Sequence, residues 1–256
     1  MNLPIPVGAK YINLSSESAL LASNTNLQRN CNSRIKLDNK ILTITVNKND
    51  VDSVSKSTDR RRNEISSKMI QLNNGEKGIW GGEFKIDGHV NTVDTWYHIV
   101  QIKYNNNLRT FKNLDRSVPP FTFSLFDKYL CVRPNLNRGY IPVELIKNIV
   151  NKWISFRIEV DNSKNGSIKW YVNSFDEQGF EQNDSNIDDI TLQLKDDIKN
   201  NKITKLYKCG TYNCKDLGTV DLDSGGIYFK CGQYMSADYI INDNQSTSYR
   251  NLWAKK

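Results

Sequence analysis

The chain has 256 residues, a hydrophobic fraction of 38% and a net charge of +7 at pH 7. It can therefore bury a core, and its basic residues would attract an anionic partner wherever they cluster. No stretch approaches the roughly 18 apolar residues of a membrane span, and the first ten residues lack the apolar run of a signal peptide. All-β units often reach this length, so we expect a single domain over residues 1–256.

Short segments rich in β-branched and aromatic residues recur along the chain, separated by clusters of Asn, Asp, Gly and Ser. This pattern predicts a sandwich of antiparallel sheets. The expected strands are residues 40–47, 82–86, 96–104, 121–126, 153–160, 167–173 and 226–231. Residues 156–171 form the clearest hairpin, because Asn165-Gly166 accepts the positive φ of a tight turn. Helix signals are weak, and short helices are expected only within residues 143–152 and 190–200.

The cysteines do not have the spacing of a zinc site, because both histidines lie far from any Cys-x-x-Cys pair. They are Cys31, Cys131, Cys209, Cys214 and Cys231. Disulfides suit them better: Cys209 can close a small loop with Cys214, and Cys31 can reach Cys131, which leaves Cys231 unpaired. Cysteines used in this way are typical of a secreted, extracellular protein, which is the localisation we expect.

Residues 96–104 would place polar side chains on one face of a strand. Alternation with a period of two puts Tyr97, Gln101 and Lys103 on one face and His98 on the other. Taken alone, this segment is better explained as an ordinary strand whose solvated side carries Gln101 and Lys103. We expect His98 to face away from Gln101 and to pack in the core or against a loop.

Two further segments have the same character. Residues 60–66, if extended, would place Arg60, Arg62, Glu64 and Ser66 together, although a basic surface run is an alternative interpretation. Residues 228–234 place Tyr228, Lys230, Gly232 and Tyr234 on one face, with Cys231 on the core face as a buried free thiol. A glycine inside a strand often marks a bulge or a place where a ligand approaches the backbone, which favours a binding function for this segment.

These three segments carry a resemblance to a known family. Tyr228-Phe-Lys-Cys-Gly-Gln-Tyr234 resembles the Tyr-Phe-Lys-Ala-Gly-x-Tyr motif of jelly-roll alginate lyases. Arg62-Asn-Glu-Ile65 resembles their Arg-(Ser/Thr/Asn)-Glu-Leu motif, and Gln101-Ile-Lys103 resembles their Gln-(Ile/Val)-His motif, in the same order along the chain. Lys103 replaces the family's histidine, which shifts the resemblance towards the related glucuronan lyases.

The resemblance implies an all-β fold, a concanavalin-like β-jelly-roll of two antiparallel sheets with few short helices, whose polar residues line a concave face. It also implies a polysaccharide lyase that cleaves a uronate polymer by β-elimination, without a cofactor or a metal. Tyr234 then serves as base and acid, while Arg62 and Gln101 stabilise the charge that develops on the uronate carboxylate. A free tyrosine titrates near pKa 10, so Arg62, Lys103 and Lys230 would have to favour its phenolate.

Lys103 is a rival for the role of base. The substrate-binding surface is expected to include Glu64, Tyr228, Lys230 and Tyr97, with His89 as a weaker candidate from a neighbouring loop.

Other functions remain open at this point. A lectin could stack sugars on Trp80, Trp96 or Tyr97 without cleaving them. A glycosidase would need two carboxylates across a cleft, for which Glu83 and Asp87 are the available pair. Nucleic acid is not the expected partner, because the basic residues are interspersed with acidic ones, and no membrane partner is expected either. We therefore expect a monomer whose partner is an acidic polysaccharide, while glucuronan and the alginates stay equivalent.

Overall fold

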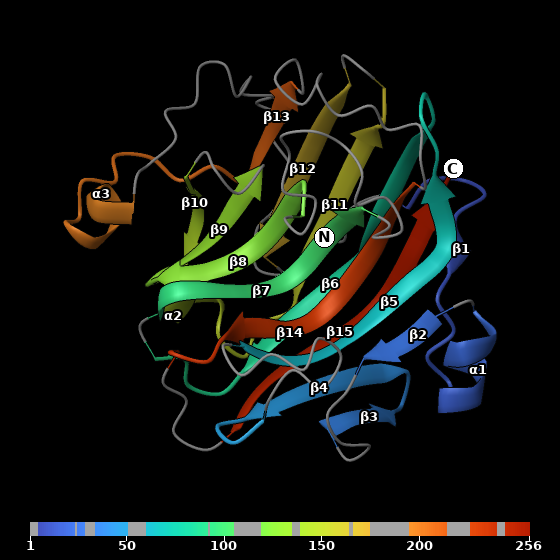
Figure 1. Ribbon diagram of the computed structural model, residues 1–256, viewed down its shortest axis with the longest axis horizontal. Helices are drawn as coiled ribbons and strands as arrows, with labels where there is room; N and C mark the ends of the chain where they lie inside the picture. Colours follow the sequence, from blue (N-terminus) through green and yellow to red (C-terminus); the bar gives the residue numbers. More distant parts are fainter. Residues whose placement is uncertain are drawn as a thin grey trace.

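The computed structural model describes residues 5–23, 25–28, 34–50, 60–91, 93–104, 119–134, 139–163, 166–174, 195–213, 226–239 and 244–256. These residues form two antiparallel sheets packed face to face, together with short helices at α1 (Glu17–Ala22), α2 (Ile146–Ile149) and α3 (Lys195–Lys199) (Figure 1). No helix in these ranges has the length and apolar character needed to span a membrane. The predicted sandwich of antiparallel sheets is confirmed.

The eight-stranded sheet has the order β13-β12-β11-β6-β15-β4-β3, with β1 paired to β15. Its strands are β1 (Lys10–Tyr11), β3 (Ile35–Asp38), β4 (Ile41–Asn47), β6 (Lys77–Asp87), β11 (Ile154–Asp161), β12 (Ser167–Ser174), β13 (Cys209–Asn213) and β15 (Asn244–Lys255). The seven-stranded sheet has the order β10-β9-β8-β7-β14-β5-β2. Its strands are β2 (Thr25–Gln28), β5 (Arg60–Leu72), β7 (Val93–Tyr104), β8 (Phe121–Asp127), β9 (Tyr129–Pro134), β10 (Ile141–Leu145) and β14 (Ile227–Ser236).

The chain crosses repeatedly from one sheet to the other, which makes the sandwich a jelly-roll. Strands β4, β5, β6 and β7 alternate between the sheets, and the last two strands do so as well. Strand β14 inserts between β7 and β5, and β15 inserts between β6 and β4 (Figure 1). As a result, three segments that are far apart in the sequence become neighbours in the seven-stranded sheet.

The core lies between the two sheets and follows the alternation of each strand. In β4, Leu42, Ile44 and Val46 are buried while the intervening residues are partly exposed. Phe84 and Phe156 of the eight-stranded sheet meet Phe123 of the other sheet, with ring centroids 5.9–6.3 Å apart. Aromatic pairs at these separations contribute beyond the area that they bury. The two sheets are therefore held in one relative position.

The expected strands are all present, but β15 was not predicted although it is central in its sheet. It escapes the hydrophobic pattern because two of its buried, inward residues, Gln245 and Thr247, are polar, while its outer side carries hydroxyl pairs. Ser248 bonds Thr43 at 3.0 Å and Ser246 bonds Thr45 at 2.8 Å. The expected helix at 143–152 is reduced to α2, because β10 extends to Leu145.

The cysteines form no disulfide among the residues that the structure describes. Cys131 and Cys231 are buried free thiols, and burial raises the pKa of both well above the ordinary value. Cys231 lies in the core between the sheets, as predicted. Cys31 and Cys214, the expected partners of Cys131 and Cys209, lie outside the described residues.

Candidate functional site

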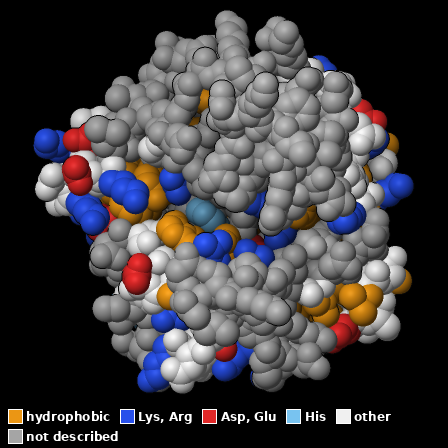
Figure 2. All heavy atoms as spheres, in the orientation of Figure 1, with side chains coloured by type: hydrophobic (Ala, Val, Ile, Leu, Met, Phe, Trp, Pro, Cys, Tyr) orange, Lys and Arg blue, Asp and Glu red, His pale blue; other side chains and the backbone are white. Residues whose placement is uncertain are grey.

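The candidate site lies on the outer face of the seven-stranded sheet, where β14 runs between β5 and β7. Cys231, Ile65 and Val100 are in the core, so the residues that alternate with them on β14 and β5 point outward. The outward pairs across the strands are Tyr228 with Lys103, Lys230 with Gln101, Gly232 with Glu64 and Tyr234 with Arg62. The expected common face of these residues is confirmed. Figure 2 shows a hollow on this side of the molecule, where lysine and arginine side chains gather around a histidine.

Glu64 is the centre of what we call the Glu64 cluster, which comprises Glu64, Arg62, Gln101 and Lys230. Its side chain is almost fully buried, and its carboxylate accepts a hydrogen bond from the amide nitrogen of Gln101. The same carboxylate lies 3.4 Å from Lys230 Nζ and 3.5 Å from Arg62 Nε. A buried carboxylate needs such partners, and here they fix the position of three side chains at once. Glu64 is therefore a positioning residue beneath the surface.

Tyr234 carries the best-defined hydroxyl on this face. Arg60 Nη1 donates a hydrogen bond of 2.7 Å to its oxygen, and the guanidinium carbon of Arg62 lies 4.2 Å from the ring centroid. Trp96 packs against Tyr234, with the two ring centroids 4.7 Å apart. The sequence placed Arg60 on this face without giving it a role, and it is the arginine that contacts the hydroxyl. A cation bonded to a phenol oxygen stabilises negative charge there.

A β-bulge in β7 changes which residues share this face. His98 pairs with Ser124 and Gln101 pairs with Thr122, so four residues of β7 lie opposite three of β8. The extra residue, Ile99, resets the alternation. The expectation that His98 faces away from Gln101 is therefore wrong, because His98 lies opposite Tyr234 on the outer face.

The same bulge places Tyr97 in the core, where its hydroxyl donates to Gln233 Oε1 at 2.9 Å. The prediction that Tyr97 binds substrate beside Gln101 is wrong for this reason. His98 and Gln101 are three positions apart, and a regular strand cannot bring residues at that spacing to one face. Two polar residues at this spacing were the only sign of a bulge in the sequence.

His98 is held in place and kept neutral. Its Nδ1 lies at hydrogen-bond distance, 2.7 Å, from Ser124 Oγ, and its ring stacks on Trp96 at 5.4 Å. Burial is the largest cause that lowers its pKa well below the ordinary value, and the positive charges of Arg133 and Lys103 act in the same direction. A neutral imidazole has one donor and one acceptor nitrogen, so His98 adds a polar group beside Tyr234 without adding a cation.

Tyr249 of the eight-stranded sheet supports the site from below. Strand β14 also has a bulge, at Gly232, opposite the one at Ile99. The Tyr249 hydroxyl accepts from the Gly232 N–H at 3.1 Å and lies as a donor 2.8 Å from the Ile99 carbonyl oxygen and 2.9 Å from that of Gly232. Bulges disrupt the ladder between strands, and here one buried hydroxyl bonds to backbone groups at both of them, with its single hydrogen shared between the two carbonyl oxygens.

The outward side chains form a positively charged surface with one buried acid. Arg60, Arg62, Lys103 and Lys230 share this face with Glu64, and Lys103 is itself largely buried. Burial, helped by Glu64 and opposed by Arg62, raises the pKa of Tyr228 to about 12, so this phenol remains a hydrogen-bond donor at neutral pH. Such a surface suits a carboxylate ligand.

His89 is not part of this cluster. It is exposed and lines a separate cavity of about 560 Å³ with Asp127 and Lys147, next to α2. The structure therefore does not bring it to Tyr234, and its expected role in substrate binding is not supported.

The acidic pair needed for a glycosidase is also engaged elsewhere. Glu83 accepts from Arg250 at 2.9 and 3.1 Å, and Asp87 pairs with Lys85 at 2.8 Å, both on the eight-stranded sheet. Two carboxylates that are each bound to a neighbouring cation do not form a pair open to a sugar.

No family model and no curated protein sequence matches the chain. Among solved structures, an endo-β-1,4-glucuronan lyase from Trichoderma reesei is similar with a TM-score of 0.50 and 10% identity, over 98% of this chain and 92% of the other. A family 7 alginate lyase with bound product has a TM-score of 0.54 and 10% identity, over 91% and 95% of the two chains. An alginate lyase from Pseudomonas aeruginosa has a TM-score of 0.53 and 12% identity, over 93% and 90%. At these identities the likeness concerns the fold: the chain has the jelly-roll sandwich of these lyases.

Proposed function

We propose that the protein is a polysaccharide lyase that cleaves a uronate-containing polysaccharide, glucuronan or alginate, by β-elimination. The observation that carries the proposal is the Tyr234 hydroxyl, held by Arg60 at 2.7 Å beside the Glu64 cluster. This arrangement provides a proton carrier next to groups that bind a carboxylate. The fold shared with alginate and glucuronan lyases supports the same reaction class.

The carboxylate of the substrate would be bound by Arg62 and Gln101. Elimination removes the proton on C5 of a uronate, and negative charge then builds on the adjacent carboxylate. Gln101 uses one amide hydrogen on Glu64 and keeps the second for the ligand. Arg62 contributes a guanidinium whose position is fixed by Glu64 and by the ring of Tyr234. Donors that are already in position stabilise this charge most effectively.

Tyr234 would carry the proton in both directions. Its phenolate, stabilised by Arg60, takes the C5 proton, and the electrons of that C–H bond pass into the carboxylate system. The bond from C4 to the glycosidic oxygen then breaks, a C4–C5 double bond forms, and the phenol returns its proton to the leaving oxygen. The products are a new reducing end and an unsaturated uronate end, and no cofactor is consumed.

Lys103 and His98 flank this exchange from β7. Lys103, opposite Tyr228, adds positive charge to the carboxylate subsite and is the alternative base. His98, neutral and opposite Tyr234, offers a hydrogen bond to a sugar hydroxyl. We further propose that residues 1–256 act as one secreted domain and as a monomer.

The proposal is tested by incubating the protein with a panel of uronans and following the ultraviolet absorbance of the new double bond. The wild-type protein should produce this signal on at least one polymer, and silence on all of them would contradict the proposal. Binding without cleavage would instead support a lectin.

The role of Tyr234 is tested with Tyr234→Phe, which removes only the hydroxyl. Because acid and base contributions are each about a hundredfold to ten-thousandfold, turnover should nearly vanish while uronan binding persists. Tyr11→Phe, at a half-exposed tyrosine, is the matched control and should be silent. If Tyr234→Phe keeps more than about a tenth of wild-type turnover, Lys103 becomes the base.

A further inference from the structure

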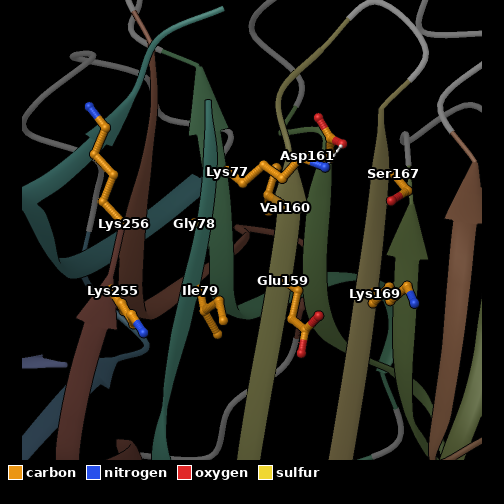
Figure 3. Close-up of a pocket in the computed structure, with 10 residues that line it drawn as sticks. All are labelled: Lys77, Gly78, Ile79, Glu159, Val160, Asp161, Ser167, Lys169, Lys255 and Lys256. Carbon is orange, nitrogen blue, oxygen red and sulfur yellow. Dashed lines mark ion pairs between the residues drawn. The ribbon is translucent and has the colours of Figure 1, made fainter. Parts of the chain in front are cut away.

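A second groove lies on the opposite side of the molecule, on the outer face of the eight-stranded sheet. Trp80, Val160 and Ile168 are buried in the core, so the residues that alternate with them on β6, β11 and β12 point outward. The groove has a volume of about 310 Å³. We call it the lysine groove, and it is lined by Lys77, Gly78, Ile79, Glu159, Val160, Asp161, Ser167, Lys169, Lys255 and Lys256 (Figure 3).

One row of side chains crosses the groove at right angles to the strands. The register pairs Lys255 with Ile79, Ile79 with Glu159 and Glu159 with Lys169. Residues directly opposite each other on antiparallel strands share a face, so these four side chains form a line over β15, β6, β11 and β12. Figure 3 shows Lys255 turned towards Ile79, with Glu159 on the next strand. The two lysines stand three strand spacings apart, about 14 Å.

The charges in the groove are unevenly matched. Lys77 pairs with Asp161 at 2.9 Å, and Lys256 pairs with Glu76 at 2.6 Å. Glu159, the acid in the middle of the row, is matched by Arg157 at 2.9 Å. Within the described part of the chain, no acid pairs with Lys169 or Lys255. The row therefore has a lysine at each end. Half-buried Ile79 and the paired Glu159 lie between the two lysines.

We infer that the lysine groove is a second binding site for the uronate polymer, separate from the candidate active site. A polyuronate repeats its carboxylates along an extended chain, and its sugar rings expose C–H faces. Such a chain lying across the strands can bring one carboxylate to Lys255 and another to Lys169 while a ring rests on Ile79. The identity of the polymer rests on the proposed function, whereas the groove itself does not depend on catalysis.

The two sites would act together on long polymers. Lys169 and Lys255 are both partly exposed to solvent, so each contact with a carboxylate is weak. A polymer that is held at one face raises its own concentration at the other, so the groove should matter for chains long enough to be multivalent and not for short oligosaccharides.

The test uses the double variant Lys169→Glu and Lys255→Glu in the Tyr234→Phe background, which prevents cleavage. Retardation is measured in native gels that contain the polyuronate, at low and high salt. The matched control is Lys36→Glu with Lys40→Glu, which changes the net charge equally at two exposed lysines, one in β3 and one in the turn that follows it. We expect retention to weaken by about tenfold for the groove variant and little for the control, with the difference disappearing at high salt.

The groove variant with Tyr234 intact should cleave short oligosaccharides at the wild-type rate. Equal losses in both double variants would show an effect of net charge alone and would overturn the inference, as would unchanged retention. Single-stranded DNA in the gel is the counter-probe: if it is retained equally and is equally sensitive to Lys169 and Lys255, the groove binds polyanions of any kind and the uronate assignment fails. If the wild type cleaves no uronan but the groove variant still loses retention, the proposed function fails while the second site stands.

Discussion

The ion pair between Glu64 and Lys230 predicts a large and non-additive loss of stability. Both side chains are almost fully buried, and the charged atoms are 3.4 Å apart. Glu64→Gln keeps the shape but leaves Lys230 and Arg62 without the carboxylate. Removing one partner of a buried pair costs about 3–5 kcal/mol. At about 2–4 °C per kcal/mol for a chain of this size, the melting temperature should fall by roughly 6–20 °C.

A double-mutant cycle separates this pair from its surroundings. Lys230→Met should also destabilise, and the double variant should be more stable than the sum of the single losses by about 0.5–3 kcal/mol, because it leaves less uncompensated charge. Denaturant unfolding monitored by fluorescence measures all four proteins. Lys77→Met is the control, because Lys77 is 77% exposed and its ion pair with Asp161 should contribute less than about 1 kcal/mol. Losses that add to within about 0.5 kcal/mol would refute a desolvated pair.

Two further predictions concern His98 and Gly232. The pKa of His98 is lower in the folded protein than in the unfolded chain, so as the pH falls the unfolded chain takes up the proton first. The contribution of His98 to the free energy of unfolding is therefore fully present above about pH 6.5 and is lost as the pH falls below that value. His98→Gln should therefore make the melting temperature less dependent on pH between 7 and 5, and an unchanged dependence would contradict a buried neutral histidine. Gly232→Ala places a Cβ 2.5 Å from the Asn63 carbonyl oxygen and 2.6 Å from the Glu64 Cα, at a φ of +140°. Strain and overlap should cost about 2–6 kcal/mol, and a variant as stable as wild type by calorimetry would show that β14 can shift away from β5.

The outward residues of β5 and β14 were predictable because these two strands pair with each other in regular register from Phe229 to Ser236, and the bulge at Gly232 affects only the pairing of β14 with β7. Tyr234, Lys230 and Arg62 could be assigned to one face from their spacing alone. The β7 strand could not be treated in the same way, because the bulge at Ile99 leaves no mark in the hydrophobic pattern. Ile99 and Val100 are both buried apolar residues, so the hydrophobic pattern of this segment is the same with the bulge as it would be without it.

A local sequence pattern also could not predict that β5, β7 and β14 are neighbours. It depends on β14 returning between β5 and β7, a pairing that closes over more than a hundred residues. The motif resemblance supplied this information, since its three segments make chemical sense only when they are neighbours. Arg60 remained without a role because its contact with Tyr234 depends on the reach of one side chain.

The hydroxyl of Tyr249 makes the site a property of both sheets. If β5, β7 and β14 were transferred to another sandwich, every outward side chain of the site would be transferred with them. The new protein would also need a tyrosine in its other sheet whose hydroxyl contacts the two bulges. If that hydroxyl is missing, one buried backbone N–H and two buried carbonyl groups lose this hydrogen-bond partner. The transferred strands would then tend to return to regular register. His98 and Gln101 would then part to opposite sides. A transplant of this surface should accordingly include position 249 in its minimal set, although that residue faces away from any ligand.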